Sequence, residues 1–131
     1  MENTKSLIIL SLILFLSAIG CSEVRRYYYE SGELKEEANY KKGKQDGLTK
    51  TYYESGALRW KANYMGSKQE GLTREYYRSG GLKSEINYKD GQREGLSKTY
   101  YVSGEIFCID TYKDDRQIKR KIYDNNGKLK L

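Results

Sequence analysis

The side chains with the most reactive chemistry in this chain are two cysteines and a set of carboxylates, because histidine is absent. Without histidine there is no imidazole general base, no Ser-His or Cys-His nucleophile pair and no histidine ligand for zinc. Two cysteines are also too few for a zinc site built from cysteine alone, which takes four. The composition therefore excludes the commonest hydrolase and zinc chemistries.

The carboxylates predict a solvated surface rather than an acid-base pair. Adjacent acids such as Glu36 and Glu37, or Asp114 and Asp115, fall on alternate polar positions or in expected loops. A general acid needs a buried position that raises its pKa, and a calcium loop needs spaced oxygen ligands. We therefore expect no enzyme activity, no catalytic residue, no metal and no cofactor.

Cys108 is the thiol that stands apart from the N-terminal region. It occupies the position that Glu36, Trp60 and Ser84 hold in the other copies of a repeat described below. We interpret it as a small, half-buried residue. A lone cysteine in an exported protein can also be a reactive thiol or pair between molecules, so its role stays open at this point.

The first twenty residues predict a secretory signal peptide, which we assign to residues 1–20. Lys5 precedes an apolar run over residues 7–19 that only Ser11 and Ser17 interrupt. A charged start followed by an apolar stretch of this length is typical of an export signal. The run is shorter than the roughly 20 apolar residues of a membrane-spanning helix.

The step from Gly20 to Cys21 resembles the lipobox of bacterial lipoproteins, although Ala18 stands where leucine is usual. The resemblance implies cleavage between Gly20 and Cys21, acyl chains such as palmitate on Cys21, and a place in the bacterial cell envelope. Ser22 after the cysteine favours the outer membrane. Residues 21–27 would be a short tether, with a reach of roughly 25 Å at most. An ordinary signal peptide or an uncleaved anchor are the alternatives.

A motif that begins with two tyrosines and continues through Ser-Gly to leucine or isoleucine recurs every 24 residues. The copies occupy residues 28–34, 52–58, 76–82 and 100–106, and a degenerate copy occupies 123–129. We therefore expect one repeat domain over 28–131, with repeats 28–51, 52–75, 76–99 and 100–122 and a partial repeat 123–131. Fixed spacing of this kind is typical of units that pack against their neighbours.

Each repeat predicts one β-hairpin. Apolar residues alternate with polar ones from Leu58 through Trp60 and Ala62 to Tyr64, which is the pattern of a half-buried strand. Residues 48–53, rich in threonine and tyrosine, predict a second strand. The Ser-Gly steps suit tight turns, because glycine accepts a positive φ. Stacked hairpins would give about eight strands over ~40 Å.

The repeat resembles the bacterial variant of the MORN (membrane occupation and recognition nexus) repeat, which reads roughly Tyr-x-x-x-Gly-x-Leu, then Tyr-x-x-Gly-Lys, then Gly. Residues 52–72 match it closely, and the resemblance covers about 28–131. It implies an all-β fold: an elongated, single-layer antiparallel meander of stacked β-hairpins. Asp115 replaces the loop glycine of the fourth repeat, an atypical terminal unit as expected of a cap.

Tyrosine, with 14 residues, supplies the best candidate for a binding surface. Neighbouring residues of a strand face opposite sides, so each tyrosine pair places one ring on each face. One resulting row, together with Trp60, is our candidate partner-binding set, since tyrosine and tryptophan are favoured in interfaces. The alternative is that the row packs on itself as the core. The candidates are Trp60, Tyr29, Tyr53, Tyr77 and Tyr101.

These features predict a membrane-anchored, non-catalytic protein-binding repeat module. The family resemblance adds an antitoxin or immunity-type role, since proteins with this repeat variant are often described in those terms. The alternative is a structural or lipid-surface-associated envelope protein that also self-associates. The net charge of +6 is spread over the repeats and is densest at residues 119–121. We expect a protein partner and the membrane at Cys21, and no nucleic acid.

Overall fold

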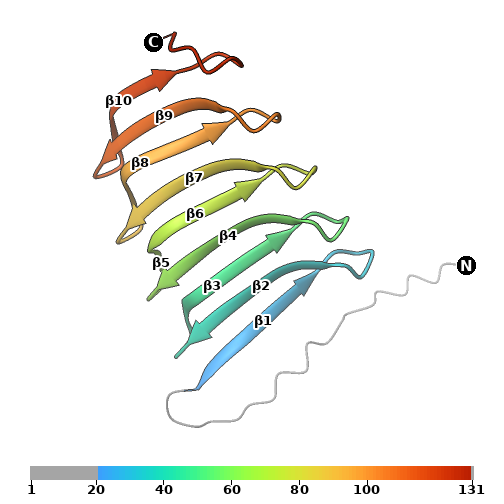
Figure 1. The fold of residues 1–131 in the computed structure, drawn as a ribbon. Helices are drawn as coiled ribbons and strands as arrows, with labels where there is room; N and C mark the ends of the chain where they lie inside the picture. The colour runs from blue at the N-terminus through green and yellow to red at the C-terminus, as the bar shows by residue number, and fades with distance from the viewer. Residues whose placement is uncertain (1–20, 131) are drawn as a thin grey trace, which may run out of the picture.

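The computed structural model describes residues 21–130, which form one open antiparallel sheet of ten strands and no helix (Figure 1). The expected all-β, single-layer meander of hairpins is confirmed. Neighbours along the chain pair in the order β1-β2-β3-β4-β6-β7-β8-β9-β10, and the short β5 pairs with β4. The strands are β1 (Ser22–Tyr28), β2 (Leu34–Lys41), β3 (Lys44–Tyr52), β4 (Leu58–Met65), β5 (Lys68–Gln69), β6 (Gly71–Tyr76), β7 (Leu82–Lys89), β8 (Gln92–Tyr100), β9 (Ile106–Lys113) and β10 (Arg116–Ile122).

The sheet begins earlier than the sequence predicted. Residues 21–27 were expected to be a tether, whereas all but Cys21 belong to β1, which pairs with β2 along its whole length. An ion pair of 2.7 Å between Arg26 Nε and Glu37 Oε2 joins the two strands. The expectation of about eight strands was therefore too low, because the first tyrosine pair needs a strand before it to complete its hairpin.

The expected signal peptide, residues 1–20 including Gly20, lies outside the described residues. Within 21–130 no helix is long and apolar enough to cross a membrane.

The turns that follow the tyrosine pairs all close with the same three-residue loop, whereas β2–β3, β7–β8 and β9–β10 are joined by two residues at the other end of the strands. In the second of the tyrosine turns, Tyr53 N donates to Ala57 O and Gly56 N donates to Tyr53 O, both at 2.8 Å. Gly56 has φ +83°, the conformation in which glycine is favoured at the end of such a loop. The same pair of backbone bonds closes the turns that start at Tyr29, Tyr77, Tyr101 and Asp124.

The core of the sheet is a single row of mostly small side chains that cross the middle of the strands. Ala38 is 0% exposed, Thr49 2% and Ala62 1%. A one-layer sheet has no opposing layer, so only positions shielded by side chains on both sides lose their contact with water. The register aligns the row from β2 to β9 through Ala38, Thr49, Ala62, Thr73, the half-buried Ile86, Ser97 and Asp110, and buried Cys108 lies two positions before Asp110 on β9.

At the turn end of the strands, a tyrosine hydroxyl joins each repeat to the next. Tyr53 Oη donates to the backbone carbonyl of Tyr76 at 2.7 Å, and Tyr77 Oη donates to that of Tyr100 at 2.6 Å. Tyr29 and Tyr101 make the same bond, to Tyr52 O and Tyr123 O. The second tyrosine of each pair therefore holds adjacent hairpins in register.

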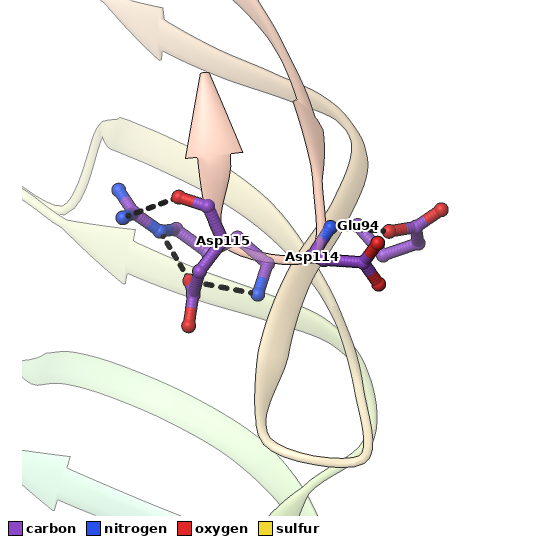
Figure 2. Close-up of polar contacts among 4 residues, drawn as sticks. Glu94, Asp114 and Asp115 are labelled. Atoms are coloured by element: carbon purple, nitrogen blue, oxygen red, sulfur yellow. Dashed lines mark hydrogen bonds and ion pairs between the residues drawn. The ribbon is translucent and has the colours of Figure 1, made fainter. Parts of the chain in front are cut away.

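At the opposite end, carboxylates make the corresponding connection. Glu94 Oε2 accepts a hydrogen bond from Asp114 N at 3.1 Å, and Arg93 and Asp115 form an ion pair of 2.8 Å beside it (Figure 2). Equivalent carboxylate bonds precede it along the sheet, from Asp90 N to Glu70 and from Gly66 N to Asp46. The carboxylate series ends with Glu94. Ile118 stands 24 residues further on, and its side chain has no oxygen to accept such a bond.

Removing one tyrosine hydroxyl should weaken the junction between two repeats. Tyr53→Phe and Tyr77→Phe should each lower the free energy of unfolding by about 1 kcal/mol, since each leaves a part-buried carbonyl without its donor. Urea denaturation followed by circular dichroism measures the change. Tyr52→Phe is the matched control, because the Tyr52 hydroxyl has no partner within 21–130. An equal loss in the control would contradict the prediction.

Candidate functional site

Trp60 lies on β4, half-buried in the open face of the sheet. Its cross-strand neighbours are Thr51 on β3 and Glu75 on β6, and its ring centroid lies 6.3 Å from that of Tyr64 in a tilted arrangement. Thr51, Arg59, Trp60 and Glu75 line a shallow depression. The indole is therefore supported on one side and accessible on the other, as an aromatic anchor for a partner requires.

A β-bulge beside each turn brings a side chain against the turn tyrosine. The register between β3 and β4 shifts between Thr51 and Tyr52, so that Arg59 is the extra residue. Its guanidinium carbon lies 5.9 Å from the centre of the Tyr53 ring. In the first repeat Lys35 lies over Tyr29 at 5.6 Å, and in the fourth Phe107 meets Tyr101 edge-on at 5.1 Å. The bulge residue covers part of the ring in these repeats.

The structure brings only part of the predicted tyrosine row near Trp60. Tyr29 and Tyr53 line a groove whose walls include Arg59 and Glu75, the two residues it shares with the Trp60 depression. Tyr77 and Tyr101 do not line that groove. All four tyrosines are half-buried and their hydroxyls are bonded within the sheet, so what they offer to a partner is ring surface.

The groove also contains charged residues that the sequence reading did not select. Lys83 Nζ donates to Glu75 Oε1 at 2.8 Å, and this hydrogen bond raises the pKa of the Lys83 ammonium. Arg78 also lies over the Tyr53 ring, with its guanidinium carbon 5.3 Å from the ring centre. Arg78 could have been found from the sequence, because it departs from the repeat. The other tyrosine pairs are followed by glutamate or valine at that position.

The two cysteines differ in their surroundings. Cys21 is exposed and directly precedes β1. Cys108 is 4% exposed on β9, and its Sγ donates to Asp110 Oδ2 at 3.3 Å. Burial, and then the hydrogen bond to Asp110, raise the pKa of the Cys108 thiol. Cys108 is thus buried rather than half-buried, and its environment disfavours the reactive thiolate.

Asp110 is the buried charge of the sheet and is held by an arginine. Arg120 on β10 donates to both carboxylate oxygens, at 2.7 and 2.9 Å. These hydrogen bonds lower the pKa of Asp110. The Asp110–Arg120 ion pair lies at the C-terminal end of the buried row. Within residues 21–130, no group of three or more acidic or cysteine side chains is placed to hold a metal ion.

The single-layer sheet and its repeated junctions define an open β-hairpin repeat protein, a class that binds through extended surfaces. The family model described as MORN repeat variant matches residues 24–42, 45–65 and 69–90. Three consecutive segments of the chain are therefore similar to the MORN repeat variant. The fourth repeat and the C-terminal turn lie outside those matches and continue the same sheet.

A solved structure described as accessory secretory protein 1, 2 and 3 in Streptococcus pneumoniae has a similar backbone over 79% of this chain, with 14% sequence identity and a TM-score of 0.44. The match covers 19% of that chain, so the present chain spans about a fifth of its length. A comparison with curated proteins found no significant match.

The Asp110–Arg120 pair makes stability depend on acid pH. Because the folded pKa of Asp110 lies below the ordinary 3.8, the pair stabilises the fold above that pH, and the contribution is lost as the pH falls through the folded pKa. Asp110→Asn should therefore be less stable than the wild type at pH 7, with the difference shrinking below about pH 4. Urea midpoints from pH 7 to pH 3 measure this. Glu30→Gln, at an exposed turn, is the control and should leave the pH profile unchanged.

Proposed function

We propose that this protein is a bacterial envelope lipoprotein, anchored through acyl chains on Cys21, whose sheet is a non-catalytic protein-binding module. MORN repeats suggest a repeat-based binding module. The observation that carries the proposal is Trp60, a half-buried indole in an open depression on a flat sheet. A repeat protein of this shape offers an extended face that suits a macromolecular surface.

The position of Trp60 in the repeat supports a binding role over a packing role. The other repeats complete the same sheet with a carboxylate, a hydroxyl or a thiol at that position, in Glu36, Ser84 and Cys108. A large ring is therefore not required to build a strand there. Tryptophan is over-represented among the residues that dominate binding energy, because it buries a large rigid area at a low entropic cost.

The partner that we propose is a single protein, which the module covers in the manner of an antitoxin or immunity protein. The antitoxin or immunity role is supported by the frequent description of proteins with this repeat variant in those terms. This support is an analogy at the level of the family. The open face fits the role, because a protein that neutralises another by covering it needs area and no reaction chemistry.

A structural or lipid-associated role in the envelope is the second candidate, favoured by cations on adjacent strands. Lys50, Lys61 and Arg74 are direct cross-strand partners on β3, β4 and β6, at about 4.8 Å spacing. Arg74 is paired with Glu85 at 2.8 Å, so Lys50 and Lys61 are the charges of this row that would attract an anionic surface, by about 1 kcal/mol each near a membrane.

The start of β1 at Ser22 determines how an anchored sheet would meet the bilayer. With acyl chains on Cys21, the first strand would follow the anchor without an intervening linker. The N-terminal edge of the sheet would then rest at the membrane surface, and the later repeats would extend from it.

Trp60→Ala should abolish capture of the partner. Crosslinked pull-down of tagged full-length protein from its native envelope should recover one dominant foreign protein with the wild type and with Trp60→Phe, which keeps an aromatic ring. The alanine variant should recover at least tenfold less while keeping its circular dichroism spectrum. Only self-crosslinks or lipid, unchanged in Trp60→Ala, would refute the binding role and favour the structural one.

Cys21→Ser should release the protein from the membrane fraction. An acylated cysteine is the anchor in the proposal, and stable attachment needs more than one chain. Metabolic labelling with a palmitate analogue, followed by fractionation, measures both points. Cys108→Ser is the matched control and should retain the label. A Cys21→Ser variant that stays labelled and membrane-bound would disprove the lipoprotein assignment.

A further inference from the structure

Three residues meet where the second and third repeats join, and two of them, Trp60 and Arg78, have no counterpart of the same type in the other repeats. The three are Arg59 at the bulge, Trp60 beside it and Arg78 in the next turn. The other repeats place Lys35, Lys83 and Phe107 at the Arg59 position, Glu36, Ser84 and Cys108 at the Trp60 position, and Glu30, Glu54 and Val102 at the Arg78 position. Arg59 keeps a cation that Lys35 and Lys83 also supply, so what distinguishes this junction is the addition of an indole and of a second arginine.

The two arginines converge on one ring that cannot move away. Their guanidinium carbons lie 5.9 Å (Arg59) and 5.3 Å (Arg78) from the centre of the Tyr53 ring. The Tyr53 hydroxyl is fixed by its bond to Tyr76 O, at 2.7 Å. A guanidinium within about 6 Å of an aromatic ring is attracted to the ring, which restricts its position while leaving N–H donors available to a ligand. The pair is thus oriented before any ligand arrives.

The carboxylates that line the groove do not pair with Arg59 or Arg78, so both guanidinium groups are available to a ligand. The groove has a volume of about 380 Å³ and is lined by three cations and two carboxylates. Lys83 is paired with Glu75 at 2.8 Å, whereas neither Arg59 nor Arg78 has an ion-pair partner within residues 21–130. The lining carries a net charge of +1, from Arg59, Arg78 and Lys83 against Glu54 and Glu75.

We propose that this groove recognises a carboxylate on an acidic segment of the protein partner. An aspartate or glutamate side chain would accept hydrogen bonds from Arg59 and Arg78, while an apolar residue next to it covers Trp60. One carboxylate balances the +1 lining, whereas a phosphate dianion would exceed it and face Glu54 and Glu75. Arginine is the residue best suited to carboxylates because its planar donors bind both oxygens. This inference rests on the proposed protein-binding function.

Trp60 reports directly on this groove, because it is the single tryptophan of the chain and the adjacent depression shares Arg59. The experiment titrates full-length protein in detergent with an acetylated hexaglutamate amide and follows tryptophan emission. Saturable binding should weaken at least tenfold in the double variant Arg59→Gln/Arg78→Gln. The charge-matched control Lys44→Gln/Lys113→Gln, which changes exposed residues of β3 and β9 outside the groove, should bind as the wild type does.

Three other results would overturn the assignment. Hexaglutamine binding as tightly as hexaglutamate would show that the carboxylate is not recognised. Inorganic phosphate, or phosphatidylglycerol added to the detergent micelles, binding through the same arginines in preference to hexaglutamate would mark a phosphate or lipid site instead. Equal affinity in the Arg59→Gln/Arg78→Gln variant would place the acidic ligand elsewhere.

The envelope pull-down separates this inference from the function on which it rests. Loss of the partner in both Trp60→Ala and Arg59→Gln/Arg78→Gln supports both. Loss in Trp60→Ala alone keeps the protein-binding function and refutes the carboxylate site. Retention of the partner in both variants refutes both.

Discussion

The hydrogen bond from a tyrosine hydroxyl to the backbone of the next repeat is the contact on which this architecture depends. A single-layer sheet cannot bury a thick core, and the row that it does bury consists of small residues such as Ala38 and Ala62. Burial of so little side-chain surface stabilises the sheet weakly. Order along the array therefore comes from contacts between neighbours: the backbone ladder pairs adjacent strands, and hydroxyl bonds at the turn end and carboxylate bonds at the loop end fix how the repeats join.

The same constraint explains where a binding site can develop. The turn tyrosines, the turn glycines and the loop carboxylates serve the junctions, so their side chains are committed to the fold. Three kinds of position do not form these junctions. They are the bulge residue, the tip of the turn and the position beside the buried row. Arg59, Arg78 and Trp60 occupy these three kinds of position, and the junction of repeats two and three brings them together.

Much of the fold could be predicted from the sequence, because the 24-residue period and the Ser-Gly turns are explicit in it. Strand β1 could not, since residues 22–28 precede the first complete copy of the motif and are mostly charged or polar. Trp60 was found as a departure from the repeat. Arg59 was missed because alternation assigns it to the solvated face, whereas the bulge, which no residue type announces, turns it toward Tyr53. Arg78 was missed since contacts between adjacent turns depend on the stacking of whole hairpins.

The strand order has a mechanical consequence. Sequence order and spatial order coincide, so β1 and β10 lie at opposite ends of the array (Figure 1). A force that pulled these two strands apart would act across the strands and load the ladder one rung after another, in an unzipping geometry rather than a shearing one. Such a sheet would yield at low tension, one hairpin at a time, and would recover from either end because each hairpin is closed by its own turn.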